Sequence, residues 1–114
     1  MPRDIVSDLI ARLGNSLDVP VSTDKHSQVK KCVTLNREGG RYENALLDRA
    51  GIGIYCWAET EYEASELAWQ VADAFKRLKF SDGYDLVEME SMRSDADPDL
   101  RTPRWYLSYT ITNH

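Results

Sequence analysis

The chain has 114 residues with 42% hydrophobic and 29% charged side chains, which is enough for one soluble domain with one core and too short for a second. Its net charge of −5 argues against a nucleic-acid binder, because such proteins need a basic face to neutralise phosphates. It has neither an apolar run near the roughly 20 residues that span a bilayer nor an N-terminal signal-peptide pattern, so we expect it to stay in the cytoplasm where it is made, without a membrane partner.

The chain begins with an amphipathic helix, predicted over 3–13. Apolar side chains recur there at helical spacing. They are Ile5, Val6, Leu9, Ile10 and Leu13. Gly14 follows as a stop signal. Residues 17–27 then contain Pro20 and a polar run, which predicts a short edge segment followed by a loop.

A strand is predicted next, over 28–36, where apolar and polar residues alternate. Its apolar positions are Val29, Val33 and Leu35. The pair Gly39-Gly40, flanked by charged residues, predicts a break after it. Residues 43–48 are ambiguous, since they fit either a helical turn or an extended entry to the following strand.

The strand predicted over 50–58 has two unlike faces. Its even positions are small or aliphatic and suit packing beneath helices. They are Ala50, Ile52, Ile54, Cys56 and Ala58. Its odd positions combine bare backbone with aromatic rings, and they are Gly51, Gly53, Tyr55 and Trp57. We expect the two glycines to let another backbone approach closely.

A long helix is predicted over 61–79, directly after this strand. Thr60 and Glu63 form a capping box at its start, in which each side chain can bond the backbone amide of the other residue. Its buried stripe is Ala64, Leu67, Ala68, Val71, Phe75 and Leu78. Its last turn carries three cations that suit the negative end of the helix dipole.

Two further strands are predicted over 84–93 and 104–112, with a polar loop at 94–102 between them. In the first we expect Val87 and Met89 to contact the core. The last strand alternates between one face with Trp105, Leu107, Tyr109 and Ile111 and another with Arg104, Tyr106, Ser108, Thr110 and Thr112. The order of elements predicts a single α+β domain over 1–114. Its sheet should be largely antiparallel, with four to five strands and both helices packed on one face.

The residue types that bind metals form no recognisable site. His26 lies in a predicted polar loop and His114 is the last residue, and neither has companions at ligand spacing. The start of a calcium loop is imitated by Asp95, Asp97 and Asp99. The sixth position of that loop is Leu100 instead of Gly, however, and the twelfth is Tyr106 instead of Glu. We expect an acidic surface loop and no cofactor.

No pattern typical of catalysis is present either. Glu88 and Glu90 share a strand face and could form an acid/base pair, but nothing apolar surrounds them in the sequence to raise a carboxyl pKa. Cys32 and Cys56 are 24 positions apart in two predicted strands, which favours reduced, buried thiols. We therefore expect a protein that is not an enzyme.

Two sets of aromatic residues fall outside the predicted core. Tyr62 and Trp69 are seven residues apart on the long helix, opposite its buried stripe and near Glu66 and Asp73. They indicate either a partner surface or a patch covered by the 41–48 segment. The second set lies on the sheet face away from the helices and comprises Tyr55, Trp57 and Tyr106. A neighbouring subunit could cover that face, or it is exposed to solvent. We hypothesise self-association.

Several short motifs, taken in order, resemble the tail terminator, or tail-completion, proteins of long-tailed bacteriophages and prophages. The resemblance extends over most of the chain, from the first helix to the last strand. The motifs are Arg37-x-Gly39-Gly40; Trp57-Ala58 at a strand end; Ala64, Leu67-Ala68 and Val71 in the helix; Asp97-Pro98; and Pro103-Arg104-Trp105. Each is weak alone, and their order and spacing together carry the likeness.

The resemblance implies a homo-oligomeric ring, usually of six subunits, that caps the tail tube at its head-proximal end. Its partners would be the tail tube protein and neck or connector proteins, with DNA only passing through the lumen. It would reside in the virion tail, after assembly in the cytoplasm of the bacterial host. A closed head-to-tail ring needs two different patches on each subunit. The candidate interface residues are Tyr62, Trp69, Tyr55, Trp57, Tyr106, Arg37, Arg41 and Arg104, although the three arginines also fit a solvated surface.

Three alternatives stay open. Within the same class, the chain could be another head–tail connector or a minor tail protein. From a second class, it could be an α+β module that binds a small ligand or RNA, for which basic residues beside the sheet aromatics would be needed. The weakest alternative is a small enzyme that uses Glu88 and Glu90 in a deep pocket.

Overall fold

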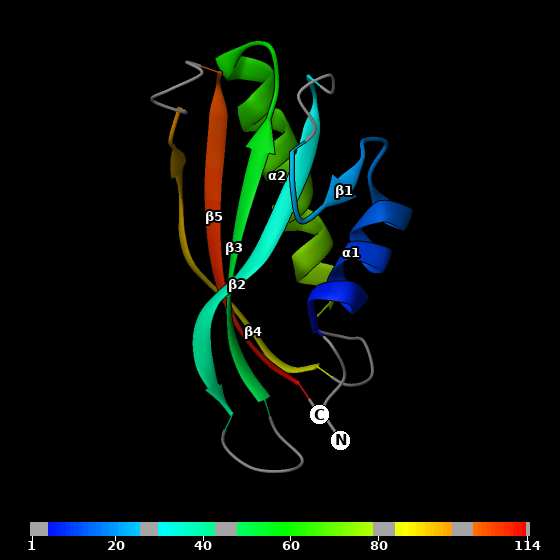
Figure 1. Cartoon of the computed structure of the whole chain (residues 1–114), viewed down its shortest axis with the longest axis vertical. Coiled ribbons are helices and arrows are strands. Elements are labelled where there is room, and N and C mark those ends of the chain that lie inside the picture. The colour runs from blue at the N-terminus through cyan, green and yellow to red at the C-terminus, as the bar shows by residue number, and fades with distance from the viewer. Residues whose placement is uncertain (1–4, 26–29, 43–47, 79–83, 97–101, 114) are drawn as a thin grey trace.

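The computed structural model describes residues 5–25, 30–42, 48–78, 84–96 and 102–113, and it has the predicted α+β architecture. Two helices lie on the same side of a five-stranded, mostly antiparallel sheet (Figure 1). The elements in chain order are α1 (Ile5–Ser16), β1 (Val21–Ser22), β2 (Cys32–Tyr42), β3 (Asp48–Trp57), α2 (Glu61–Leu78), β4 (Tyr84–Ser94) and β5 (Arg104–Asn113).

The strands are ordered β1-β2-β3-β5-β4, so the last strand of the chain inserts beside β3 and leaves β4 at an edge. All neighbouring pairs are antiparallel except the two-residue β1, which runs parallel to β2. The 18 residues of α2 extend about 27 Å at the usual rise per residue. This length returns the chain to the other end of the sheet, where β4 starts in the same direction as β3.

The core lies between the helices and the inner face of the sheet. The even positions of β3 are buried there as predicted, and they are Ala50, Ile52, Ile54 and Cys56. From α1 come Ile5, Leu9 and Leu13, which are buried as well. Phe75 of α2 stacks on Tyr109 of β5 with ring centroids 4.1 Å apart. Burying one such ring contributes about 1.5–3 kcal/mol, so this pair anchors the long helix to the centre of the sheet.

The first helix is longer than its sequence pattern indicates. It continues through Gly14 to Ser16, and the backbone amide of Leu17 still donates to the carbonyl of Leu13 at 2.9 Å. Leu17 is buried and extends the apolar stripe by one turn. The gain from burying this side chain outweighs the weak helix preference of a single glycine.

The prediction of a break at Gly39-Gly40 was wrong. Strand β2 runs through both glycines to Tyr42, and the ladder with β3 absorbs the irregularity as a register shift between Arg37 and Gly39. A bulge of this kind keeps the strand paired and adds one residue to it. The strand also starts later than predicted, at Cys32, and residues 43–47, which the sequence left ambiguous, lie outside the described residues.

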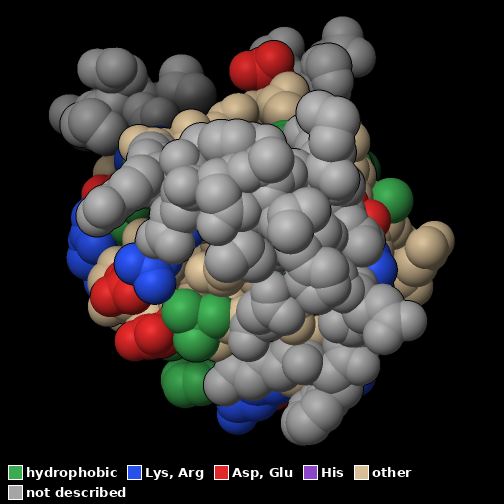
Figure 2. Space-filling model, turned by 90° about the horizontal axis from the view of Figure 1, so that it is seen from below, with side chains coloured by type: hydrophobic (Ala, Val, Ile, Leu, Met, Phe, Trp, Pro, Cys, Tyr) green, Lys and Arg blue, Asp and Glu red, His purple; other side chains and the backbone are tan. Residues whose placement is uncertain are grey.

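The strands run along the long axis of the molecule, so the ends of several elements gather at its two ends (Figure 1). The ends of β3 and β4 and the starts of α2 and β5 meet at the upper end in Figure 1. Figure 2 looks at the lower end, where the described charged side chains are of both signs.

Candidate functional site

Three aromatic rings lie side by side on the outer face of the sheet, away from the helices. Tyr55 pairs with Tyr106 across β3 and β5, and their ring centroids are 5.0 Å apart. Trp57 follows Tyr55 by two residues and therefore points to the same face, with a centroid distance of 6.2 Å. The structure thus brings together the aromatic residues that the alternation of these strands predicts for this face.

From the sequence, we expected these rings to be covered by a neighbouring subunit or exposed to solvent. For two of them this was wrong, because they are buried within the chain itself. Trp57 is 7% exposed and Tyr106 is 9% exposed, whereas Tyr55 is half-buried. Cations of the same chain lie over the rings. The guanidinium of Arg93 is 4.6 Å from the centroid of Tyr106, and the ammonium of Lys25 is 5.5 Å from that of Trp57. Such contacts are favourable because the ring face is electronegative.

Arg104 is the most firmly held of these cations. Its guanidinium lies 4.2 Å from the ring centroid of Tyr55 and 5.0 Å from that of Trp57. Its Nε donates to the backbone carbonyl of Asp95 at 2.7 Å, and its Nη2 is 3.3 Å from the Asp95 carboxylate. We call the set Tyr55, Trp57, Tyr106, Lys25, Arg93 and Arg104 the aromatic–cation face. Arg104, which was predicted at an interface, belongs to it, whereas Arg37 does not.

The polar ends of two buried rings have their own partners. The indole N–H of Trp57 donates to Thr34 Oγ1 at 3.1 Å, and the hydroxyl of Tyr106 donates to Glu38 Oε2 at 2.6 Å. Burial and this hydrogen bond to Glu38 both raise the pKa of Tyr106. The Glu38 side chain lies over Gly53, where a Cβ would collide with it. The sequence predicted that Gly53 lets another backbone approach closely. The space above it is occupied by the Glu38 side chain instead.

The outer side of α2 presents the other aromatic pair. Tyr62 is 69% exposed and Trp69 is 60% exposed, so both rings lie outside the core as predicted. The Tyr62 hydroxyl donates to Glu66 Oε1 at 2.8 Å, and this hydrogen bond raises the pKa of Tyr62. Asp73 continues the same exposed side one turn beyond Trp69. We call Tyr62, Glu66, Trp69 and Asp73 the acidic ridge.

The remaining arginines of the prediction lie on β2. Arg37 is exposed, and its Nη2 is 3.4 Å from the backbone carbonyl of Arg49. It pairs with Ile52, three residues before Tyr55, which places it about 10 Å along the strand from the nearest ring of the aromatic–cation face. Arg41 lies in the same strand, but its side chain is not among those described. Arg37 therefore does not join the other predicted residues.

A groove runs between α2 and β4, with an open volume of about 210 Å³. Ala72, Phe75, Lys76, Val87, Met89 and Tyr109 line it. Val87 is buried as predicted, whereas Met89 is 41% exposed because it stands on an edge strand beside this groove. Ligand pockets usually measure roughly 300–1,000 Å³, so the groove is small. Glu88 and Glu90 are exposed on β4 and do not line it.

Sequence reasoning missed Lys25, Arg93 and Glu38. Arg93 pairs with Tyr106 in the β4–β5 ladder, but only after a register shift between Met89 and Ser91 that no sequence pattern reveals. Glu38 reaches the outer face through the bulge in β2. The sequence offered one signal for Glu38, which is its place directly before the glycine pair, because glycines often accompany a bulge.

Within the described residues, no group of three or more His, Cys, Asp or Glu is placed to hold a metal ion, and neither helix is long and apolar enough to cross a membrane. Cys32 and Cys56 are free thiols and are buried, as predicted. Burial raises the pKa of both. No model of a known protein family matches the chain, and no curated protein matches it either.

Proposed function

We propose that the protein is a structural virion-assembly protein, a ring-forming tail terminator that caps the tail tube of a long-tailed phage and joins it to the head or neck. One observation carries the proposal furthest. The molecule has two unlike surfaces on opposite layers, the aromatic–cation face outside the sheet and the acidic ridge outside the helices. A subunit of a closed head-to-tail ring needs two different contact surfaces of this kind.

The acidic charge of the chain fits passage of DNA through such a ring. Each copy carries a net charge of −5, so a ring of several copies is strongly negative. Like charge repels the phosphate backbone and keeps passing DNA from binding to the wall. The ring would act in the virion tail and would assemble in the bacterial cytoplasm, with the tube protein and neck proteins as partners. A related role as another connector or a minor tail protein fits the same surfaces.

Purified protein provides the direct test. Size-exclusion chromatography with light scattering measures the mass in solution, and negative-stain electron microscopy shows whether the particles are rings. We expect closed rings with a single subunit number. A strict monomer at the highest attainable concentration, without rings on the grid, overturns the proposal. Genes for a major tail protein and a tape-measure protein beside this one would support it independently.

A second candidate, a sheet that binds single-stranded RNA, gains from Arg93 and Lys25, since cations beside sheet aromatics are what such a module requires. The same contacts also weigh against it. Bases would have to stack where Arg93 and Arg104 already lie over Tyr106 and Tyr55. Fluorescence anisotropy with labelled single-stranded RNA at low salt decides between the two. We expect no salt-dependent binding; affinity that falls steeply with salt would favour the RNA reading.

A further inference from the structure

The acidic ridge combines exposed rings with charge of one sign. Its two acids are Glu66 and Asp73, and α2 has no Lys or Arg before Lys76. Tyr62 and Trp69 are seven residues apart, which is about 10 Å along the helix axis. Large exposed rings are typical of partner surfaces, and their acidic surroundings select a partner with positive charge.

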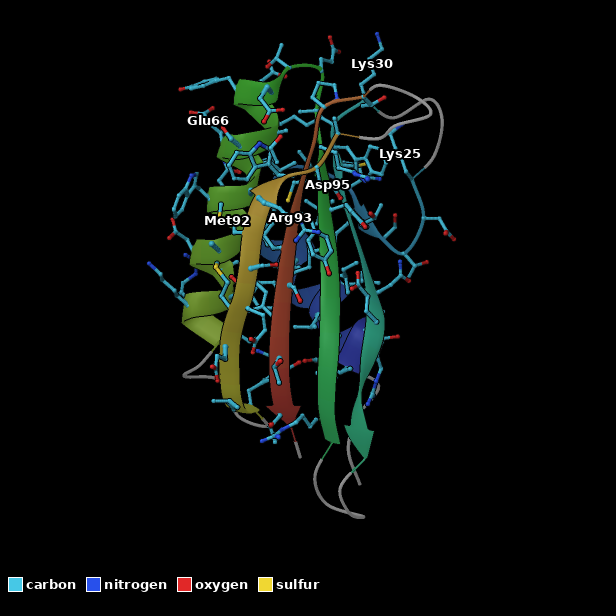
Figure 3. The ribbon with its side chains drawn as sticks, turned by 90° about the vertical axis from the view of Figure 1, so that its left-hand side faces the viewer. Lys25, Lys30, Glu66, Met92, Arg93 and Asp95 are labelled. Carbon is cyan, nitrogen blue, oxygen red and sulfur yellow. The ribbon has the colours of Figure 1, made fainter. Side chains whose placement is uncertain are left out.

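The aromatic–cation face offers positive charge of its own. Arg93 is exposed and Lys25 is half-buried, and among the described residues no carboxylate lies within ion-pair distance of either. The nearby acids are otherwise engaged, since Asp95 binds Arg104 and Glu38 accepts from Tyr106. Figure 3 looks onto this face and shows Arg93 and Lys25 on it, with Glu66 on α2 beyond the edge strand.

The dimensions of the two surfaces agree. The guanidinium of Arg93 lies over Tyr106 of β5, and the ammonium of Lys25 lies over Trp57 of the neighbouring strand β3. One strand spacing and two residues along the strand separate these two rings, which is about 8 Å. The two acids of the ridge, Glu66 and Asp73, are seven residues apart, which is a similar distance of about 10 Å along the helix. A helix laid across the strands could therefore place acidic side chains against both cations at once.

We propose that the acidic ridge of one copy docks on the aromatic–cation face of a second copy. The two surfaces lie on opposite layers of the molecule, so one chain cannot join its own pair. Each docking event leaves one ridge and one face unused, and the contact therefore repeats head to tail until it closes. The inference rests on the proposed self-association and specifies which surfaces meet.

Charge reversal on each side provides the test. Glu66→Arg makes the ridge positive against a positive face, and Arg93→Glu makes the face negative against a negative ridge. Both side chains are exposed, so circular dichroism should show unchanged folding. We expect each variant alone to self-associate at least about tenfold more weakly than the natural chain, because like charges then face each other. Sedimentation velocity over a concentration series measures this.

Mixing the two variants is the decisive step. The positive ridge of Glu66→Arg then meets the negative face of Arg93→Glu, and the natural ridge of the second variant meets the natural face of the first. Every contact is complementary in an alternating assembly, so an equimolar mixture should self-associate again and, in a ring with an even number of subunits, regain the natural size. The doubly substituted chain should regain it as well. A matched control is Asp18→Arg, which reverses an exposed charge outside both surfaces and should change nothing.

The outcomes separate this inference from the proposed function. If the natural chain forms rings and both single variants form them equally well, the docking inference is wrong and the ring remains. If the single variants fail and the doubly substituted chain also fails, Glu66 and Arg93 do not face each other, and the inference is wrong again. A natural chain that never associates overturns both.

Discussion

A substitution at Gly53 should test the contact between this glycine and the carboxylate of Glu38. A Cβ at this position would collide with the Glu38 side chain, whose Oε2 accepts a hydrogen bond from the Tyr106 hydroxyl at 2.6 Å. The backbone at Gly53 is not in the left-handed region, so alanine is not excluded by conformation. Gly53→Ala should therefore displace Glu38 and break its bond to Tyr106, while β3 itself stays intact.

The size of the effect follows from two opposing contributions. A hydrogen bond to a charged group contributes about 1.5–3 kcal/mol, and the exposure of Glu38 favours the lower value. Replacing glycine by alanine gains about 0.5 kcal/mol, because the unfolded chain loses conformational freedom. We expect Gly53→Ala to lower the free energy of unfolding by about 1 kcal/mol.

The same substitution should change sign when the carboxylate is gone. In a Glu38→Ala background, Gly53→Ala should raise the free energy of unfolding by about 0.5 kcal/mol, which gives a coupling of about 1.5 kcal/mol between the two sites. Urea denaturation of the four proteins measures it. Tyr106→Phe is a control that removes the hydroxyl and keeps the ring. Equal cost in both backgrounds would refute the reasoning, since the cost would then arise in the backbone.

Three further predictions concern stability. Thr34→Val removes the acceptor of the buried Trp57 indole N–H and should lower the free energy of unfolding in urea by about 1–3 kcal/mol. Thr60→Ala removes the oxygen that accepts from the Glu63 amide at 3.1 Å and should cost about 1 kcal/mol in thermal unfolding. Burial raises the pKa of Tyr109 from 10.0 to about 12, so the folded state holds this proton more tightly than the unfolded state does. The stability from this group is therefore complete below pH 10 and is lost as the pH rises toward 12, which urea denaturation across that range should show.

Each of these predictions has a matched control. Thr34→Ser and Thr60→Ser keep the hydroxyl, so their free energies of unfolding should stay close to that of the natural chain. If each serine variant loses as much stability as Thr34→Val or Thr60→Ala, which lack the hydroxyl, the hydrogen-bond explanation is contradicted. Tyr109→Phe removes the titrating group. If stability falls between pH 10 and 12 as steeply in this variant as in the natural chain, Tyr109 is not the cause.

The sequence predicted the elements wherever one local pattern had no competitor. Helix α2 begins at its capping residue and buries the stripe that its spacing indicates, and β5 alternates as predicted. The prediction was wrong at Gly14 and at Gly39-Gly40. In both places a glycine reads as a stop signal, yet a distant contact decides the outcome. Leu17 is buried in the core, and β2 pairs with β3 across the glycines.

The sequence also predicted some residues of the candidate site and left others unrecognised. The sequence identified Tyr62 and Trp69 as exposed, because a helix has one buried stripe and these residues lie opposite it. It also placed Tyr55, Trp57 and Tyr106 on one face, because alternation fixes the face of every strand residue. It did not reveal that Arg93 and Lys25 cover that face, since this depends on strand order and on a register shift.

By itself, then, the chain determined periodic features: which positions face the core, where α2 starts, and the α+β class. Tertiary structure alone decided the strand order β1-β2-β3-β5-β4 and the neighbours that this order creates. Periodicity depends on residues a few positions apart, and local geometry suffices to express it. The meeting of Arg104, Asp95 and Tyr55 depends on strands distant in the chain, and it exists only after the sheet has formed.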